Sequence, residues 1–431
     1  MAAMVPQPDG PGKRHTRAAM SAPAAATEAA LPSTNPASTM GAPSTRPGFF
    51  GLALLDDRYP ALHGLRVLAI LSVIQYHVTW VISTFPEVEL NQQFLDGSLS
   101  VFFGMDCFFV LSGFLIGSIL IRSLDTSGTQ NIRRFYLRRI FRTFPSYWVV
   151  LTFLALAFPL STFQREHLVY EYTYLTNFVP LARDQVVMFW GWSLSLEEQF
   201  YLAVPLLFVL LQRLPTDRAR LMFLAALMLS AAVVRCAVYY EGRPWTDLRL
   251  YDEMYFRTGT RYDAIVAGIL LAMAEARYGA WIAKWLERPL HRAALAVPAL
   301  GCCWLLLRPD LFGENHEQHV HLFTWGTVTS LMFLMTVPMV LHGDGWIVRF
   351  LSAPIWRRLA TVGYGVYLVH IPVMDHIGMP MVLHFRERDV SLAFAWPMAF
   401  AVVTTLSFAI GYALHVLIEK PSLRIREWLA A

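Results

Sequence analysis

An arginine and a histidine stand at the two ends of one apolar stretch, RVLAILSVIQYH, which spans residues 66–77. On an α-helix, eleven steps advance about 16 Å and turn almost back to the starting direction, so Arg66 and His77 share one face. A cation at the membrane edge and a histidine at depth suit an anionic ligand that enters from the cytoplasm. The alternative is structural, with Arg66 as a topology anchor and His77 as a satisfied polar group between helices. These two residues alone favour neither interpretation.

Further polar side chains lie inside other apolar stretches of the chain. The set comprises Asp106, Ser112, Glu197, Glu198, Arg261, Asp263, Tyr364, Tyr367 and His370. Tyr364, Tyr367 and His370 follow one another at three-residue spacing, which brings them near one helix face. Isolated charges inside a membrane are costly, so carboxylates on three helices and histidines on two others predict a shared polar cavity.

An arginine-rich segment, RRFYLRRIFR, covers residues 133–142, where we predict a cytoplasmic loop. Arg139 and Arg142 are three positions apart, so on a helical turn both can face one phosphate group, which guanidinium recognises with two parallel hydrogen bonds. By itself, the segment is better explained by the general preference of basic residues for the cytoplasmic side of a membrane.

Other sites of chemistry have weaker support. The segment ENHEQHVH offers His316, His319 and His321 at a spacing that could hold zinc, but no carboxylate motif accompanies them, and we predict no metal site. The four cysteines fall in apolar stretches and are interpreted as packing residues. No phosphate-binding loop, dinucleotide fingerprint or nucleophile elbow is present.

The elements that must position these residues are apolar runs. Of the 431 residues, 56% are hydrophobic and 15% are charged, which is well below the roughly 25% charged residues of soluble domains. We predict one all-α integral membrane bundle of about ten helices, each near the 20 residues that a crossing needs. The predicted runs are 64–82, 99–121, 145–163, 193–212, 220–239, 261–277, 292–307, 321–342, 361–383 and 393–417. Residues 1–48, rich in Ala, Pro, Ser and Thr, are predicted to be a disordered tail.

The distribution of basic residues predicts the orientation of this bundle. The connections on the side of the termini, with the tail, carry 24 Lys and Arg, whereas the opposite connections carry nine. This bias predicts that both termini are cytoplasmic in a multi-pass protein of the cell (inner) membrane. A net charge of +4 is weak evidence about partners, and no nucleic-acid partner is predicted.

Seven stretches, in order, resemble the acyltransferase 3 family of membrane O-acyltransferases. They are GLRVLAILSVIQYH, GMDCFFVLSGFLIG, FYLRRIFRTFPSYW, WSLSLEEQFYLAVP, RYDAIVAGILLA, YGVYLVHIPV and LIEKPSLRIR. The resemblance covers the chain from about residue 60 to 426 and identifies this segment as the transmembrane acyltransferase domain. Met105 and Cys107 stand where the family more often has branched residues, which puts no catalytic position in doubt.

The resemblance implies transfer of an acyl group, often acetyl, from cytoplasmic acyl-coenzyme A to a hydroxyl of a carbohydrate or other glycosylated or lipidic acceptor. It implies His77 as the catalytic histidine, Arg66 as its paired cation, and Arg139 and Arg142 as the donor-associated pair. The other positions that match its motifs are Asp106, Ser112, Glu197, Glu198 and His370. Acyl-coenzyme A is expected as a substrate, with no bound cofactor.

These expectations combine into one mechanistic hypothesis. His77 acts as the general base on the acceptor hydroxyl, and Glu197 or Asp106 fixes its tautomer. The substrate-contacting set is expected to comprise Arg139, Arg142, Ser112, Glu198, Asp263, Tyr367 and His370. Two other classes stay open: a transporter of an acyl or acylated group, whose proton relay would use the same buried residues, and a non-catalytic scaffold.

Overall fold

The structure is a computed structural model that describes residues 50–84, 91–127, 132–182, 184–242, 252–307 and 318–430. The tail predicted over residues 1–48 lies outside the described residues. The α-helices are α1 (Pro60–Ser83), α2 (Gln92–Leu99), α3 (Gly104–Ser127), α4 (Ile132–Ala157), α5 (Thr162–Tyr172), α6 (Trp192–Arg213), α7 (Asp217–Glu241), α9 (Thr258–Arg261), α10 (Asp263–Leu286), α11 (Pro289–Leu306), α12 (Gln318–His342), α13 (Trp346–Leu351), α14 (Pro354–Val373), α15 (Met379–Arg386), α16 (Leu392–Leu414) and α17 (Lys420–Ala430).

Shorter turns connect or extend these helices. The 3₁₀ turns are η1 (Ser100–Phe103), η2 (Thr176–Phe178) and η3 (Phe189–Gly191), and the π-helical turns are η4 (Asp252–Phe256), η6 (Met374–Gly378) and η7 (His415–Glu419). Within the described ranges no residue forms a β-strand. Ten helical segments of this part are long and apolar enough to cross a membrane, which confirms the all-α, ten-helix prediction.

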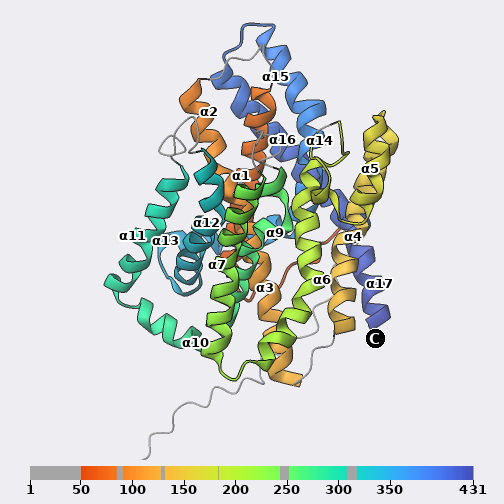
Figure 1. Cartoon of the computed structure of the whole chain (residues 1–431). Coiled ribbons are helices and arrows are strands. Elements are labelled where there is room, and N and C mark those ends of the chain that lie inside the picture. The colour runs from red at the N-terminus through yellow and green to blue at the C-terminus, as the bar shows by residue number, and fades with distance from the viewer. Residues whose placement is uncertain are drawn as a thin grey trace, which may run out of the picture. The chain divides into compact units, whose positions relative to one another are not determined.

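The arginine-rich segment is helical, so the prediction of a loop at residues 133–142 was wrong. Helix α4 begins at Ile132 and runs to Ala157, with Pro145 in its interior. Proline has no N–H to bind the carbonyl four residues earlier, which here belongs to Phe141. The Ser422 hydroxyl of α17 donates to that carbonyl oxygen at 2.8 Å. Because α17 lies beside α4 (Figure 1), a tertiary hydrogen bond satisfies the carbonyl that Pro145 leaves without a helical partner.

Helices α3 and α10 pack together through glycine. A Cβ atom at Gly113 would overlap the carbonyl oxygen of Ile265, and one at Gly268 would overlap that of Val110. Small residues allow such close backbone approach between membrane helices, where van der Waals contact is a main source of association. The crossing fixes the spacing of α3 and α10, the helices that carry Asp106 and Asp263.

Helix α1 lies between two apolar clusters. Ala69 and Val73 pack into the larger cluster, which includes residues of α3, α6 and α10, whereas Ile70 and Ile74 pack into a smaller one with α14 and α16. This arrangement puts the helix that carries Arg66 and His77 next to both α3 and α14.

Candidate active site

A cavity of about 130 Å³ opens among α1, α3, α4, α6 and α14. Seven of the polar residues singled out in the sequence line it: Arg66, Ser112, Arg139, Arg142, Glu197, Tyr364 and Tyr367. They come from five different helices, so the predicted polar cavity exists and its walls are assembled by the tertiary fold.

The three arginines of this cavity have unusual surroundings. Across the described part of the chain, none of Arg66, Arg139 and Arg142 forms an ion pair with a carboxylate. The guanidinium of Arg139 instead lies over the ring of Tyr201, 3.8 Å from its centroid, and its Nε is buried without a hydrogen-bond partner. A cation–π contact offsets part of the cost of burying such a group. The arginines are therefore left available to a negatively charged ligand.

Carboxylates lie near these arginines, beyond ion-pair distance. Glu197 is close to Ser112 and Tyr201, and its charge acts on Arg66 and Arg139. Glu198 lies near Arg139. The Ser112 hydroxyl is hydrogen-bonded to Tyr201, which links α3 to α6 across the cavity. Ser112 is therefore engaged in the contact between helices.

His77 and His370 form a hydrogen-bonded pair. The Nδ1 of His370 lies 2.6 Å from the carbonyl oxygen of Tyr367, and its Nε2 lies 3.1 Å from the Nδ1 of His77. The Nδ1 of His77 also lies 3.0 Å from the carbonyl oxygen of Val73. Carbonyl oxygens only accept, so the hydrogen of each neutral imidazole belongs on Nδ1. This tautomer makes Nε2 of His77 the basic nitrogen.

The Nδ1 of His77 is thus oriented by a carbonyl of its own helix and by a second histidine. Asp106, which the sequence suggested for this task, lies elsewhere: its two oxygens accept from Arg261 at 2.9 Å and from the indole of Trp325 at 3.0 Å.

Aromatic rings surround the histidine pair. The ring of His77 lies 6.4 Å from Trp80 and 6.5 Å from Phe189, and that of His370 lies 6.5 Å from Trp190, measured between centroids. Tyr367 donates to the carbonyl oxygen of Trp190 at 2.8 Å and is hydrogen-bonded to Ser193 at 2.6 Å. These bonds join α14 to η3 and the start of α6, and they fix the rings that cover the pair.

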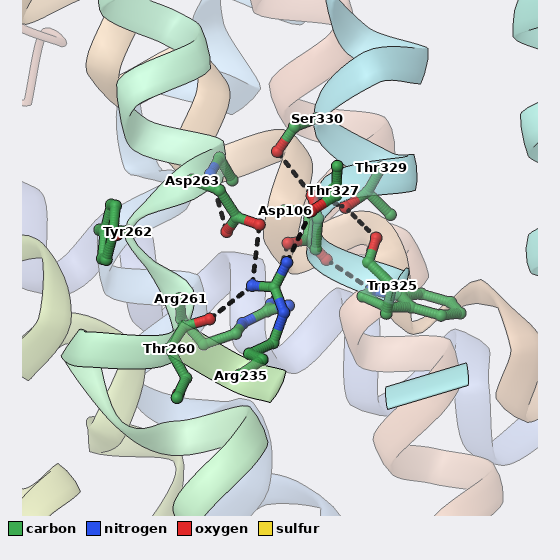
Figure 2. A network of polar contacts seen from close by, with 12 residues as sticks. Asp106, Arg235, Thr260, Arg261, Tyr262, Asp263, Trp325, Thr327, Thr329 and Ser330 are labelled. Atoms are coloured by element: carbon green, nitrogen blue, oxygen red, sulfur yellow. Dashed lines mark hydrogen bonds and ion pairs between the residues drawn. The ribbon is translucent and has the colours of Figure 1, made fainter. Parts of the chain in front are cut away.

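Asp106 and Asp263 belong to a separate network of polar contacts (Figure 2). The carboxylate of Asp263 pairs with Arg235 at 2.9 Å, and Arg235 donates further to the carbonyl oxygen of Thr260 at 2.6 Å and to the Thr327 hydroxyl at 2.7 Å. All four charged side chains of this network, which also includes Arg261, are at most 2% exposed. Asp263, predicted to contact substrate, is instead held in a compensated structural cluster.

Several of these residues were not predicted from the sequence. Arg235 lies inside the predicted run 220–239 and could have been noticed as a charge within the membrane. Tyr201, Ser193 and Trp325 carry no signal of their own, because aromatic and hydroxyl residues are common in membrane helices. His316 and the side chains of His319 and His321 lie outside what the structure describes. Within the described residues, no group of three or more His, Cys, Asp or Glu could hold a metal.

Comparisons with known proteins support the resemblance. The chain is 26% identical to the "Peptidoglycan O-acetyltransferase OatA" of Listeria monocytogenes over 371 residues, which is 81% of this chain and 54% of the relative. It is 29% identical to the "Putative peptidoglycan O-acetyltransferase YrhL" of Bacillus subtilis over 385 residues, 84% of this chain and 54% of the relative. A "Putative O-acetyltransferase" of Staphylococcus aureus (strain COL) is 25% identical over 359 residues, 78% and 55% of the two chains.

This chain therefore spans about half the length of the curated relatives it matches. No solved structure matches it. The family model described as an acyltransferase domain matches residues 59–416. With most of its length matched by that model, the chain belongs to the acyltransferase 3 family.

Proposed function

We propose that this protein is a multi-pass membrane O-acyltransferase. It transfers an acyl group, acetyl by default, from cytoplasmic acyl-coenzyme A to a hydroxyl of a carbohydrate, a glycolipid or a glycosylated small molecule. The observation that carries the proposal is the cavity of Arg66, Arg139 and Arg142, three arginines without a carboxylate at ion-pair distance among the described residues. Beyond this cavity lies the histidine pair.

The arginines suit the phosphates of coenzyme A. Guanidinium groups form charge-assisted, two-pronged hydrogen bonds with phosphate oxygens. A cavity of about 130 Å³ is too small for the whole donor, so it would receive the acyl thioester while the nucleotide stays at the mouth. Arg66 lies eleven residues before His77, an axial rise of about 16 Å. That separation favours donor steering by Arg66 over contact with the reacting carbonyl.

His77 supplies the base. Its Nε2 takes the proton of the acceptor hydroxyl as the hydroxyl oxygen attacks the thioester carbonyl. A C–O bond forms, the C–S bond breaks, and the imidazolium returns the proton to the departing thiolate, so the products are the acyl ester and free coenzyme A. A positioned base of this kind contributes about 10²–10⁴-fold to the rate. Aromatic rings around the pair keep water from competing as the acceptor.

Location and acceptor class complete the proposal. The excess of Lys and Arg on one side supports a cell (inner) membrane protein with both termini in the cytoplasm. Two of the relatives bear names that specify peptidoglycan O-acetyltransferases, which makes glycan hydroxyls the first acceptors to test.

The first experiment measures donor binding. Acetyl-coenzyme A is titrated by calorimetry into the detergent-purified protein and into an Arg139→Ala, Arg142→Ala double variant. We expect saturable binding to the wild type and its loss in the double variant. Arg133→Ala, which removes an exposed arginine from the first turn of the same helix, is the matched control and should bind normally. If the wild type bound neither acetyl-coenzyme A nor longer acyl-coenzyme A donors, the proposal would be overturned.

The second experiment separates the enzyme from a carrier. Free coenzyme A is measured with peptidoglycan fragments present and absent. An enzyme releases it in step with acylated glycan, whereas a carrier moves the group without that stoichiometry. His77→Ala should lower transfer at least 100-fold and still bind the donor, and His384→Ala, an exposed histidine, is its control. Near-normal turnover of His77→Ala would disprove the base assignment.

A further inference from the structure

A second cavity, of about 170 Å³, lies farther along the same helices. Its walls include Phe158, Phe189, Trp190, Pro372, Asp375 and His376. None of these residues lines the arginine cavity, although both cavities use α4, α14 and the segment around η3.

The order of residues along the chain shows how the two cavities are arranged. On α14 the arginine cavity is lined by Gly363, Tyr364 and Tyr367, then comes His370, and then the second cavity is lined by residues from 372 onward. On α4, Arg139 and Arg142 line the first cavity, and Leu154, with Phe158 just after the helix, lines the second. In the segment of η3 and α6 the order is reversed: Phe189 and Trp190 line the second cavity, and Ser193 and Glu197, later in the chain, line the arginine cavity. The two cavities therefore follow one another along the helix axes, with the histidine pair between them.

Two aromatic residues belong both to the second cavity and to the surroundings of the histidine pair. Phe189 lines the cavity and lies 6.5 Å from His77, and Trp190 lines it and lies 6.5 Å from His370. The buried carboxylate of Glu171 holds the chain just before them, since it accepts from the backbone N–H groups of Val187 at 2.8 Å and Met188 at 2.7 Å. The second cavity is thus separated from the catalytic histidines by one layer of positioned rings.

The lining of the second cavity has a polar and an aromatic part. His376 stacks on Phe158 with ring centroids 4.3 Å apart and ring planes 4° from parallel. Asp375 and His376 project from the π-helical turn η6, where the helix that carries His370 widens. Turns of this kind recur at functional sites. A flat ring platform beside a carboxylate matches a sugar, whose apolar face packs on rings while its hydroxyls bind carboxylate oxygens.

We propose that this second cavity is the acceptor site, that it binds a carbohydrate, and that the acceptor reaches the histidine pair from the membrane face opposite the donor. The inference rests on the proposed acyl transfer and adds a location and a direction to it. Phe189 and Trp190 form the partition through which a single hydroxyl reaches His77. Donor and acceptor therefore never share an entrance, and the acyl group crosses most of the bilayer in the transfer step.

The test compares donor and acceptor kinetics in variants of the second cavity. Purified protein is assayed with radiolabelled acetyl-coenzyme A and, as acceptors, lysozyme-released peptidoglycan fragments and an N-acetylglucosamine tetramer. His376→Ala and Phe158→Leu should each raise the acceptor KM at least tenfold and leave the affinity for acetyl-coenzyme A within twofold. Ile377→Ala is the matched control, because Ile377 lies in the same π-helical turn, is exposed, and does not line the cavity.

Each outcome of this comparison bears on one claim. An active wild type whose acceptor KM is unchanged in both cavity variants would overturn the acceptor site and leave the proposed function standing. Equal losses for donor and acceptor would also overturn it, since they indicate a general structural defect. A wild type that binds acetyl-coenzyme A but acylates neither glycan would remove the carbohydrate acceptor, and with it this inference.

A second test asks which membrane face each cavity opens to, and it does not depend on enzyme activity. His376→Cys and Arg138→Cys are each treated with a membrane-impermeant maleimide in intact cells and after lysis, and the unsubstituted chain gives the background of its own cysteines. We expect labelling at position 376 in intact cells and labelling at position 138 only after lysis. Labelling of position 138 in intact cells, or labelling of position 376 only after lysis, would contradict entry from opposite faces.

Discussion

Two groups of charged residues, one buried and one half-buried, contact the same helix, α3, and they differ in how completely their charges are paired. In the network of Figure 2, Asp106 pairs with Arg261 and Asp263 pairs with Arg235, both at 2.9 Å, and indole, hydroxyl and carbonyl groups take further bonds. In the arginine cavity, two turns along α3, no described carboxylate comes within ion-pair distance of the cations.

This difference separates two uses of buried charge. A network with equal numbers of cations and anions, each in an ion pair, needs no ligand and can hold α3, α7, α10 and α12 together in a low-dielectric interior. A cavity with three cations and incompletely paired carboxylates is costly unless something else supplies negative charge. The contrast predicts that variants of the first group change stability and variants of the second change binding.

The largest expected effect is on stability and comes from Asp106. Asp106→Ala leaves the guanidinium of Arg261 buried without its anion, which should lower the free energy of unfolding by about 3–5 kcal/mol. The measurement is thermal unfolding in detergent. The double variant Asp106→Ala, Arg261→Met should be less destabilised than Asp106→Ala, because both charges are gone. If Asp106→Ala instead unfolded normally and lost donor binding, Asp106 would belong with the arginine cavity.

The opposite result is expected for Arg142. Arg142→Met removes a cation that has no ion pair among the described residues, so stability should change by about 0.5 kcal/mol or less. The Kd for acetyl-coenzyme A should rise at least tenfold. Calorimetry and unfolding on the same preparation check both quantities. A loss of stability above about 2 kcal/mol would reveal a structural role for this arginine and weaken the contrast.

A smaller effect is expected where α3 crosses α10, the contact that lies between the two groups. An added methyl at Gly268 meets backbone atoms of Val110, Gly113 and Phe114, so it cannot be accommodated by a side-chain rotation. Gly268→Ala should therefore cost about 1–3 kcal/mol, the usual range for overpacking. Gly301→Ala on α11, where an added Cβ meets nothing within 4 Å, should be neutral or slightly stabilising. Equal unfolding temperatures for the two variants would mean that this crossing tolerates separation.

Much of the fold follows from composition alone. The lipid interior forces every backbone group to bond within its own helix, so apolar length predicts the crossings reliably. The prediction failed at the start of α4, because Arg139, Arg142 and Pro145 resemble the boundary at which an apolar run begins. A hydrogen bond from Ser422, 281 residues away, helps that helix to continue, and no local pattern could indicate it.

The sequence predicted many of the residues of the candidate site, but not which of them contact one another. Arg66, Ser112 and Glu197, which line the arginine cavity, stand out as polar side chains in apolar runs. Arg139 and Arg142 stand out as a pair in an arginine-rich segment. Which carboxylate meets which cation depends on how helices cross, so the partners of Asp106 and Asp263 could not be deduced. The same holds for His77, whose companion His370 lies 293 residues away.

Glu171 is a buried carboxyl group of a third kind, because backbone N–H groups donate to it. The smallest predicted effect is the pH dependence of stability that it causes. Burial raises the pKa of Glu171 to about 7, although the bonds from Val187 and Met188 oppose this shift. A carboxyl group whose pKa is higher in the folded protein binds more protons when folded, so its stabilising contribution is full below about pH 4.5 and is lost as pH rises through 7. Between pH 6 and pH 8 the loss amounts to about 1 kcal/mol. The unfolding temperature should fall accordingly over this interval, and Glu171→Gln, which cannot ionise, should flatten the profile. An unchanged profile in Glu171→Gln would show that the backbone bonds already hold the carboxylate ionised, and the segment before Phe189 and Trp190 would then be equally well positioned at both pH values.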